Sequence, residues 1–147
     1  MAGKKILIAD DEARLRKLVS DYLVREGYEV LEAADGEQAL DIFYREKDLS
    51  LMILDVMMPG VDGFMVCKEV RETSQIPIVM LTAKSEENDI LNGYEYGADE
   101  YIPKPFSPKI LVAHVNAIIR RTSDADDGNK DLLEADGIVK YKEMEDK

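Results

Sequence analysis

Several polar residues of the sequence are of types that could bind a cation and an anion at one place. They are Asp10, Asp11, Glu12, Asp55, Thr82 and Lys104. Carboxylates gathered in one site raise one another's pKa and destabilise a fold unless positive charge lies among them. Lys104 supplies one such charge, and a hard divalent cation would supply the rest. A set of oxygen ligands that leaves room for water favours Mg²⁺ over zinc or copper.

These residues can form a site only if the fold brings their parts of the chain together. Apolar runs that predict strands occupy residues 5–9, 29–33, 51–54, 77–82 and 100–102. Stretches with helical spacing separate and follow them, with apolar stripes such as Leu15, Leu18, Val19, Tyr22 and Leu23. The last stripe is formed by Leu111, Val112, Val115, Ile118 and Ile119. Five strands that alternate with five helices predict an α/β fold built on a parallel sheet.

The polar residues fall at one edge of this predicted sheet. Asp10 follows the first strand, Asp55 the third and Lys104 the fifth, while Thr82 ends the fourth. Open parallel sheets bind ligands beyond the carboxyl ends of their strands. Each residue alone has an ordinary structural explanation, since an Asp can cap a helix and Lys104–Pro105 can form a turn. Their position at the ends of four strands of one sheet favours a shared site.

Composition narrows the class of protein. The chain has 147 residues, 46% hydrophobic and 34% charged, which suits one globular domain with a buried core. A formal net charge of −12 makes the chain a poor binder of nucleic acid. No apolar run approaches the roughly 20 residues that a bilayer requires. The single Cys67 excludes an internal disulfide, and the single His114 excludes a metal site of several histidines. We expect a soluble cytoplasmic protein.

The last part of the chain has a different character. Residues 122–147 are acidic, and the run at residues 123–129 is typical of a loop. Residues 138–141 could begin another strand. The sequence therefore predicts a folded domain over residues 1–121, followed by an acidic linker over residues 122–147.

Four sequence segments together resemble the receiver domain of two-component response regulators. They read IADDE at residues 8–12, ILDVMMPGVDG at 53–63, VMLTA at 79–83 and GADEYIPKPF at 97–106. The resemblance covers residues 4–121 and includes each motif in order. It implies a flavodoxin-like, doubly wound sheet of five parallel strands in the order 2-1-3-4-5, with five helices.

The resemblance also implies a role for each residue of the predicted site. Asp55 would accept a phosphoryl group from the phosphohistidine of a sensor histidine kinase. Asp11, Asp55 and the backbone carbonyl of Met57 would hold Mg²⁺, with Asp10 acting through a bound water. Thr82 would hydrogen-bond one phosphoryl oxygen and Lys104 would pair with another. The Lys104–Pro105 peptide is typically cis in this family. Such a domain is a phosphoacceptor that assists its own phosphoryl transfer and autodephosphorylation, not an enzyme.

Two further features follow from the same resemblance. Thr82 and Tyr101 match the family's switch pair, in which the hydroxyl moves toward the phosphoryl group and the ring turns inward from an outward position. Receivers that precede winged-helix domains pair through the fourth helix, fifth strand and fifth helix. The residues here that match or replace that dimer face are Ile90, Asp99, Glu100, Ile110 and Arg121. Ile90 and Ile110 stand where the family usually has an Arg and a Glu, and we expect them to meet across a phosphorylation-dependent homodimer.

The sequence is compatible with three functions to different degrees. The first is the regulatory domain of a transcription factor, because residues 137–142 weakly resemble the first strand of a winged-helix output domain. The sequence would then be truncated, and DNA would be bound only through the absent domain. The second is a receiver that acts alone through protein contacts. The third, an aspartyl-phosphate phosphatase, is disfavoured because Met57 stands where that family has its acid/base Asp. A nucleotide-binding switch would require a Gly-rich phosphate loop, which the sequence lacks.

Overall fold

The computed structural model describes residues 3–83 and 95–135, with side chains described as far as Thr122. The described residues form a five-stranded sheet in the order β2-β1-β3-β4-β5. All neighbouring strands are parallel. The strand bounds are β1 Lys5–Ala9, β2 Glu29–Ala33, β3 Leu49–Asp55, β4 Ile78–Thr82 and β5 Glu100–Pro103. The structure confirms the predicted α/β class and the predicted strand order.

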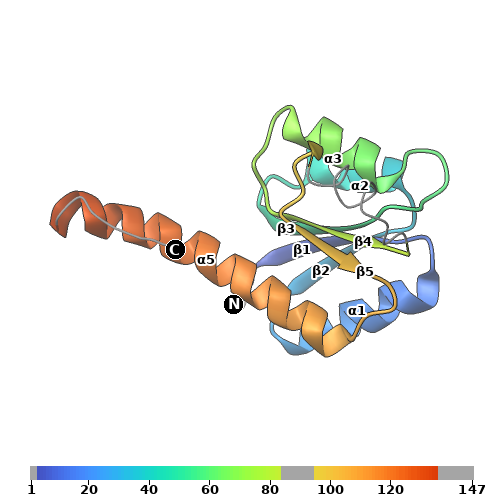
Figure 1. The fold of residues 1–147 in the computed structure, drawn as a ribbon, viewed down its shortest axis with the longest axis horizontal. Helices are drawn as coiled ribbons and strands as arrows, with labels where there is room; N and C mark the ends of the chain where they lie inside the picture. The colour runs from blue at the N-terminus through green and yellow to red at the C-terminus, as the bar shows by residue number, and fades with distance from the viewer. Residues whose placement is uncertain (1–2, 84–94, 136–147) are drawn as a thin grey trace. The chain divides into compact units, whose positions relative to one another are not determined.

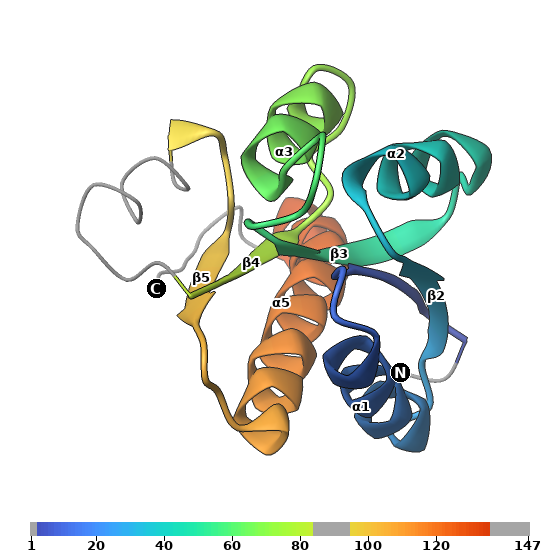
Figure 2. The ribbon, with the colours of Figure 1, turned by 90° about the vertical axis from the view of Figure 1, so that its right-hand side faces the viewer.

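Helices cover both faces of this sheet (Figures 1 and 2). They are α1 Ala13–Arg25, α2 Gly36–Arg45, α3 Gly63–Arg71 and α5 Pro108–Ala135. Helices α2 and α3 lie together on one face, whereas α1 and the beginning of α5 lie on the other. The fourth predicted helix falls mainly on residues 84–94, which are outside the described residues. Gly27 and Gly97 follow helical segments and adopt positive φ angles of 99° and 97°, as expected of glycines that end helices.

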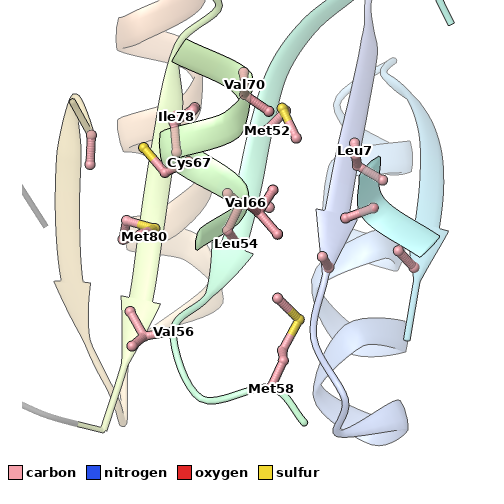
Figure 3. Packing of buried hydrophobic residues seen from close by; sticks show 14 of the residues in the cluster. Leu7, Met52, Leu54, Val56, Met58, Val66, Cys67, Val70, Ile78 and Met80 are labelled. Carbon is pink, nitrogen blue, oxygen red and sulfur yellow. The ribbon is translucent and has the colours of Figure 1, made fainter. Parts of the chain in front are cut away.

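The core beneath α2 and α3 is built from alternate residues of the strands (Figure 3). Side chains from β1, β3 and β4 pack there against α3, and their buried members include Leu7, Met52, Leu54, Ile78, Met80, Val66 and Val70. The intervening strand residues, such as Ile6, Ile8, Ile53 and Leu81, are also fully buried. Strands buried on both faces explain why the sequence shows continuous apolar runs instead of alternation. This packing fixes the strand ends that carry the polar residues.

Helix α5 differs from the sequence prediction. It continues to Ala135, so the prediction of a loop at residues 123–129 is wrong in its secondary structure. An established helix gains one backbone hydrogen bond for each residue added, and no proline follows Pro108 within α5 to interrupt it. The chain divides into two compact units, residues 1–114 and 115–147, so the division falls within α5. Although α5 has 28 residues, no helix in the described residues is long and apolar enough to cross a membrane.

Candidate functional site

The polar residues predicted to share a site come from the carboxyl ends of neighbouring strands. Asp10 follows β1, Asp55 is the last residue of β3, and Thr82 is the last residue of β4. All three are buried, with exposed fractions of 0%, 2% and 0%. Carboxylate oxygens of Asp10, Asp11 and Asp55 all lie within 4.8 Å of one another, with Asp11 exposed. The structure thus brings together the three carboxylates that sequence analysis places there.

Lys104, in the loop after β5, reaches into this cluster. Its Nζ lies 3.2 Å from Oδ2 of Asp10 and 3.4 Å from Oδ2 of Asp55. Burial disfavours the ammonium, but the charges of Asp55 and Asp10 outweigh that effect and raise the pKa of Lys104 above 10.5. Lys104 is therefore charged at neutral pH and bridges two buried carboxylates. The peptide between Lys104 and Pro105 is cis, as the resemblance implies.

Asp55 remains an electrostatically unfavourable carboxylate in spite of this bridge. Burial is the largest cause, and the neighbouring charge of Asp10 adds to it. Lys104 and the backbone N–H of Met57 act in the opposite direction, and the net effect raises the pKa of Asp55 to about 6. A positive ion beside Asp55 would remove much of this penalty. The site has the chemistry of a nucleophile or ligand that requires a counter-charge.

The backbone on either side of Asp55 is held by close contacts. The Met57 N–H donates to Oδ1 of Asp55 at 3.3 Å, and the Gly63 N–H donates to the Val56 carbonyl at 3.1 Å. Gly63 begins α3 against β3, and a Cβ atom there would lie only 2.5 Å from the Asp55 carbonyl oxygen. Asp62 caps α3 by accepting from the Met65 N–H at 2.9 Å. The loop that follows Asp55 therefore needs glycine at position 63, where the chain passes close to the Asp55 backbone.

The donor set fits a hard divalent cation. The cluster of Asp10, Asp11 and Asp55 offers one oxygen from each residue, and it is the one group of this kind found within residues 3–83 and 95–122. Carboxylate and carbonyl oxygens with room for water are the usual surroundings of Mg²⁺. The Met57 backbone lies directly beside the cluster through its N–H bond to Asp55. These residues are compatible with the magnesium site expected from the sequence.

The two predicted switch residues lie on adjacent strands. Met80 pairs with Tyr101, and Thr82 pairs with Pro103, so the side chains of Thr82 and Tyr101 point to the same face of the sheet. Thr82 is fully buried, and Tyr101 is 8% exposed within the core cluster. The adjacency that the predicted coupling requires is present.

The predicted dimer-face residues have different surroundings. Ile110 is 57% exposed and Arg121 is exposed, whereas Ile90 lies outside the described residues. Glu100 contacts His114 within the same chain, with Oε2 of Glu100 3.4 Å from Nδ1 of His114. Asp99 already has partners within the domain. Its Oδ2 lies 3.0 Å from Nη2 of Arg71 and accepts a hydrogen bond from the Ile78 N–H at 2.8 Å.

Arg71, the partner of Asp99, carries no signal in the sequence that marks it as such. Arg71 ends α3 and also donates from Nε to the Gly97 carbonyl at 3.0 Å. No spacing rule connects it with Asp99, because the two residues belong to different elements and meet only after α3 packs on the sheet. A basic residue in the last turn of a helix predicts only a favourable dipole interaction.

Comparison with known proteins identifies the family of this arrangement. Residues 6–116 match the family model for the response regulator receiver domain. A probable transcriptional regulator, ycf27, of Porphyridium aerugineum is 48% identical over 139 residues, covering 95% of this chain and 57% of that protein. The transcriptional regulatory protein ResD of Bacillus subtilis is 50% identical over 119 residues, covering 81% and 49%. The chain spans about half the length of these curated relatives.

Solved structures show the same fold. A CheY-like receiver domain protein of Methanospirillum hungatei superposes with a TM-score of 0.79 at 25% identity, covering 84% of this chain and 99% of that one. The chemotaxis protein CheY4 of Vibrio cholerae superposes with a TM-score of 0.74 at 37% identity, covering 79% and 98%. The matched residues include Asp10, Asp55, Thr82 and Lys104 within the family's span. This chain belongs to the response regulator receiver domain family, and its relatives include transcriptional regulators.

Proposed function

We propose that this chain is a phosphorylation-controlled switch in which Asp55 accepts a phosphoryl group from the phosphohistidine of a sensor histidine kinase. The supporting observation is the arrangement around Asp55: Asp10 and Asp11 lie beside it, and Lys104 bridges it to Asp10. Phosphoryl transfer depends on positioned oxygens and neutralised charge more than on separate acid and base groups. This cluster offers both.

The chain's own residues account for the transfer step. A carboxylate oxygen of Asp55 attacks the phosphorus atom, the phosphorus–nitrogen bond to the kinase imidazole breaks, and the imidazole leaves with that electron pair. The product is an acyl phosphate on Asp55. Because the pKa of Asp55 is about 6, the nucleophile is mostly ionised at neutral pH. Lys104 pairs with one phosphoryl oxygen, and Thr82 donates a hydrogen bond to another.

Magnesium fits the same arrangement. Asp11, Asp55 and the Met57 carbonyl would hold the ion directly, and Asp10 would act through a bound water. When bound, Mg²⁺ supplies positive charge to the phosphoryl oxygens and to the clustered carboxylates. Lys104 is the fixed positive charge of the site and Mg²⁺ the exchangeable one.

The surroundings of the site leave room for a partner. A pocket of about 400 Å³ opens beside Lys104, and its lining is mainly apolar, with Leu15, Ala83, Pro105 and Phe106 as members. Lys104 lines this pocket and lies 3.4 Å from Oδ2 of Asp55, so a kinase that delivers a phosphohistidine to Asp55 would contact α1 and the loop after β5. Apolar rim residues favour a protein partner over a small charged donor alone.

The phosphorylation experiment tests the proposed function. The protein is incubated with Mg²⁺ and a small phosphodonor such as acetyl phosphate, and its intact mass is measured over time. We expect one phosphoryl group per chain, formed only with Mg²⁺ and located by peptide mapping to the segment that contains Asp55. A chain that stays unmodified with both reagents, or that is modified equally well in excess EDTA, would contradict the proposal.

We further propose that the phosphoryl group acts at a distance through Thr82 and Tyr101. Movement of Thr82 toward a phosphoryl oxygen changes the space beside Tyr101, which neighbours it on the same face of the sheet. The buried ring would hold the face around β5 in one arrangement. This regulated face would control a transcriptional output domain in a cytoplasmic DNA-binding protein, with residues 122–147 as the connection that follows the receiver domain of residues 1–121.

The regulated output includes homodimerisation through the face that carries Ile110 and Glu100. Asp99 contributes less than expected, because Arg71 already pairs with it. Apolar burial of Ile110 would then carry much of the contact, which makes dimerisation weakly sensitive to salt. Ile90 and Arg121 remain expected members of this face.

Replacing Ile110 with glutamate is expected to weaken the phosphorylated dimer by about tenfold or more, because a charge would be buried without a partner. Sedimentation velocity with beryllofluoride and Mg²⁺ measures the change. Val24→Glu is the matched control, since Val24 on α1 has the same 57% exposure as Ile110. Equal dimerisation of both variants, or a wild-type dimer that dissociates in moderate salt, would show that ion pairs govern the contact.

A further inference from the structure

One arginine contacts the backbone of the acidic cluster without belonging to it. Arg16 lies in α1, and its Nη1 donates to the Asp10 carbonyl oxygen at 2.7 Å. Its Nε donates to Oε1 of Glu32 on β2 at 2.9 Å. The Arg16 side chain is 18% exposed, so most of it is packed against the protein. One planar group therefore links α1, β2 and the residue that follows β1.

The contact falls on the peptide unit that joins the two acidic residues. The Asp10 carbonyl and the Asp11 N–H belong to one rigid plane, so a hydrogen bond to that carbonyl fixes the orientation of both residues. The remaining groups of Asp10 are already fixed. Its N–H donates to the Ala33 carbonyl at 3.1 Å, and its Oδ1 accepts from the Glu12 N–H at 2.8 Å. Arg16 adds the restraint on the peptide that joins Asp10 to Asp11.

We propose that Arg16 is a positioning residue for the magnesium site and acts through the Asp10–Asp11 peptide. This inference rests on the proposed function. Glu32 holds the guanidinium by accepting from Nε of Arg16, and Nη1 then donates to the Asp10 carbonyl. The role belongs to the shape of the side chain, because a guanidinium offers several N–H donors in a fixed fork and an ammonium is a single point charge. Partners of this kind commonly change metal affinity by 10- to 100-fold, an order-of-magnitude expectation.

Two substitutions separate geometry from charge. Arg16→Lys keeps the positive charge and loses the fork, whereas Arg16→Met loses both. Lys17→Met is the matched control, because Lys17 is the next residue of α1, is 73% exposed and pairs with Asp21 at 3.0 Å. It removes the same charge from the same helix without touching Asp10. Circular dichroism defines the temperature range in which every variant is folded.

The test measures Mg²⁺ affinity by isothermal titration calorimetry without any phosphodonor, and then the phosphorylation rate at rising Mg²⁺. We expect Arg16→Lys and Arg16→Met to bind Mg²⁺ roughly tenfold more weakly, with Lys17→Met near wild type. The phosphorylation rates of the two Arg16 variants should approach the wild-type rate at saturating Mg²⁺. A merely structural role would lower the melting temperature but leave Mg²⁺ affinity unchanged in the folded range.

The outcomes separate this inference from the proposed function. If Arg16→Lys bound Mg²⁺ with wild-type affinity and only Arg16→Met bound it more weakly, the charge of Arg16 and not its geometry would be the cause, and the positioning role would be wrong. Wild-type affinity in both would overturn any role, while phosphorylation of Asp55 would still stand. If Arg16→Met does not fold, Arg16→Lys alone decides the matter. A wild-type protein that neither binds Mg²⁺ nor accepts a phosphoryl group would overturn both.

Discussion

Replacing Asp55 with asparagine is expected to abolish covalent phosphorylation and, at neutral pH without metal, to stabilise the protein. An amide cannot form the acyl phosphate, so the intact mass should stay unchanged with acetyl phosphate and Mg²⁺. The stability gain has an electrostatic origin. Burial and the charge of Asp10 raise the pKa of Asp55 from 3.8 to about 6. Each pKa unit corresponds to about 1.4 kcal/mol, which places the gain at about 2 to 3 kcal/mol.

The pH dependence gives this prediction its sign. Between pH 3.8 and about 6 the folded wild type keeps a proton on Asp55 that the unfolded chain has released. The free energy of unfolding of the wild type therefore falls as pH rises through this window. Asp55→Asn lacks that loss, so the difference between the two proteins should open across the window and stay constant above it. Urea unfolding at a series of pH values measures it.

A control and a metal titration complete the test. Asp41→Asn removes one negative charge from an exposed position on α2, so it reports the effect of net charge alone. Added Mg²⁺ should stabilise the wild type more than Asp55→Asn, because the ion binds the folded site. If the wild type and Asp55→Asn were equally stable at pH 7 without metal, Lys104 would already neutralise the cluster. Phosphorylation of Asp55→Asn at the wild-type rate would place the acceptor elsewhere.

The sheet and most of its site could be predicted from sequence because their signals are short-range. Strands β1 and β2 have the predicted bounds, while β3 is longer than the apolar run of residues 51–54. Leu49 still pairs with Lys5, and Asp55 still pairs with Leu81. Backbone pairing extends past the continuous apolar run because it depends on the neighbouring strands and not on side-chain type. Asp55 is thus both the end of a strand and the centre of the site.

Side-chain pairs between distant elements could not be predicted in the same way. Arg71 with Asp99, and Arg16 with the Asp10 carbonyl, join residues from separate elements. Long flexible side chains can reach several acceptors, and the packed fold decides which one lies at the right distance. The extension of α5 beyond Arg121 is not predicted by the sequence for a related reason. Polar and acidic residues weaken a helix, yet they do not end one that is already formed.

Replacing Lys104 with methionine is expected to destabilise the metal-free protein by about 3 kcal/mol at pH 7, because removal of one partner leaves buried like charges uncompensated. Lys104 lies within 3.4 Å of both Asp10 and Asp55, whose side chains are 0% and 3% exposed. Methionine keeps an apolar stem of similar length, so the loss reports charge more than packing. The pKa of Asp55 should rise further, since the coulombic attraction that lowers it is removed.

Magnesium and a second substitution decide whether charge is the cause. Saturating Mg²⁺ should restore most of the lost stability, and Lys104→Met with Asp55→Asn should be more stable than Lys104→Met alone, with a coupling of about 1 to 3 kcal/mol. The variant should still accept a phosphoryl group, more slowly, because Lys104 pairs with the phosphoryl oxygens and forms no bond. Lys109→Met, at an exposed position of α5, is the control for the loss of one positive charge. A Lys104→Met protein as stable as the wild type without metal would show that this ammonium does not neutralise the buried carboxylates. A destabilised variant that Mg²⁺ cannot restore would show that lost packing, and not lost charge, is the cause. In either case burial and the charge of Asp10 would remain the causes that raise the pKa of Asp55.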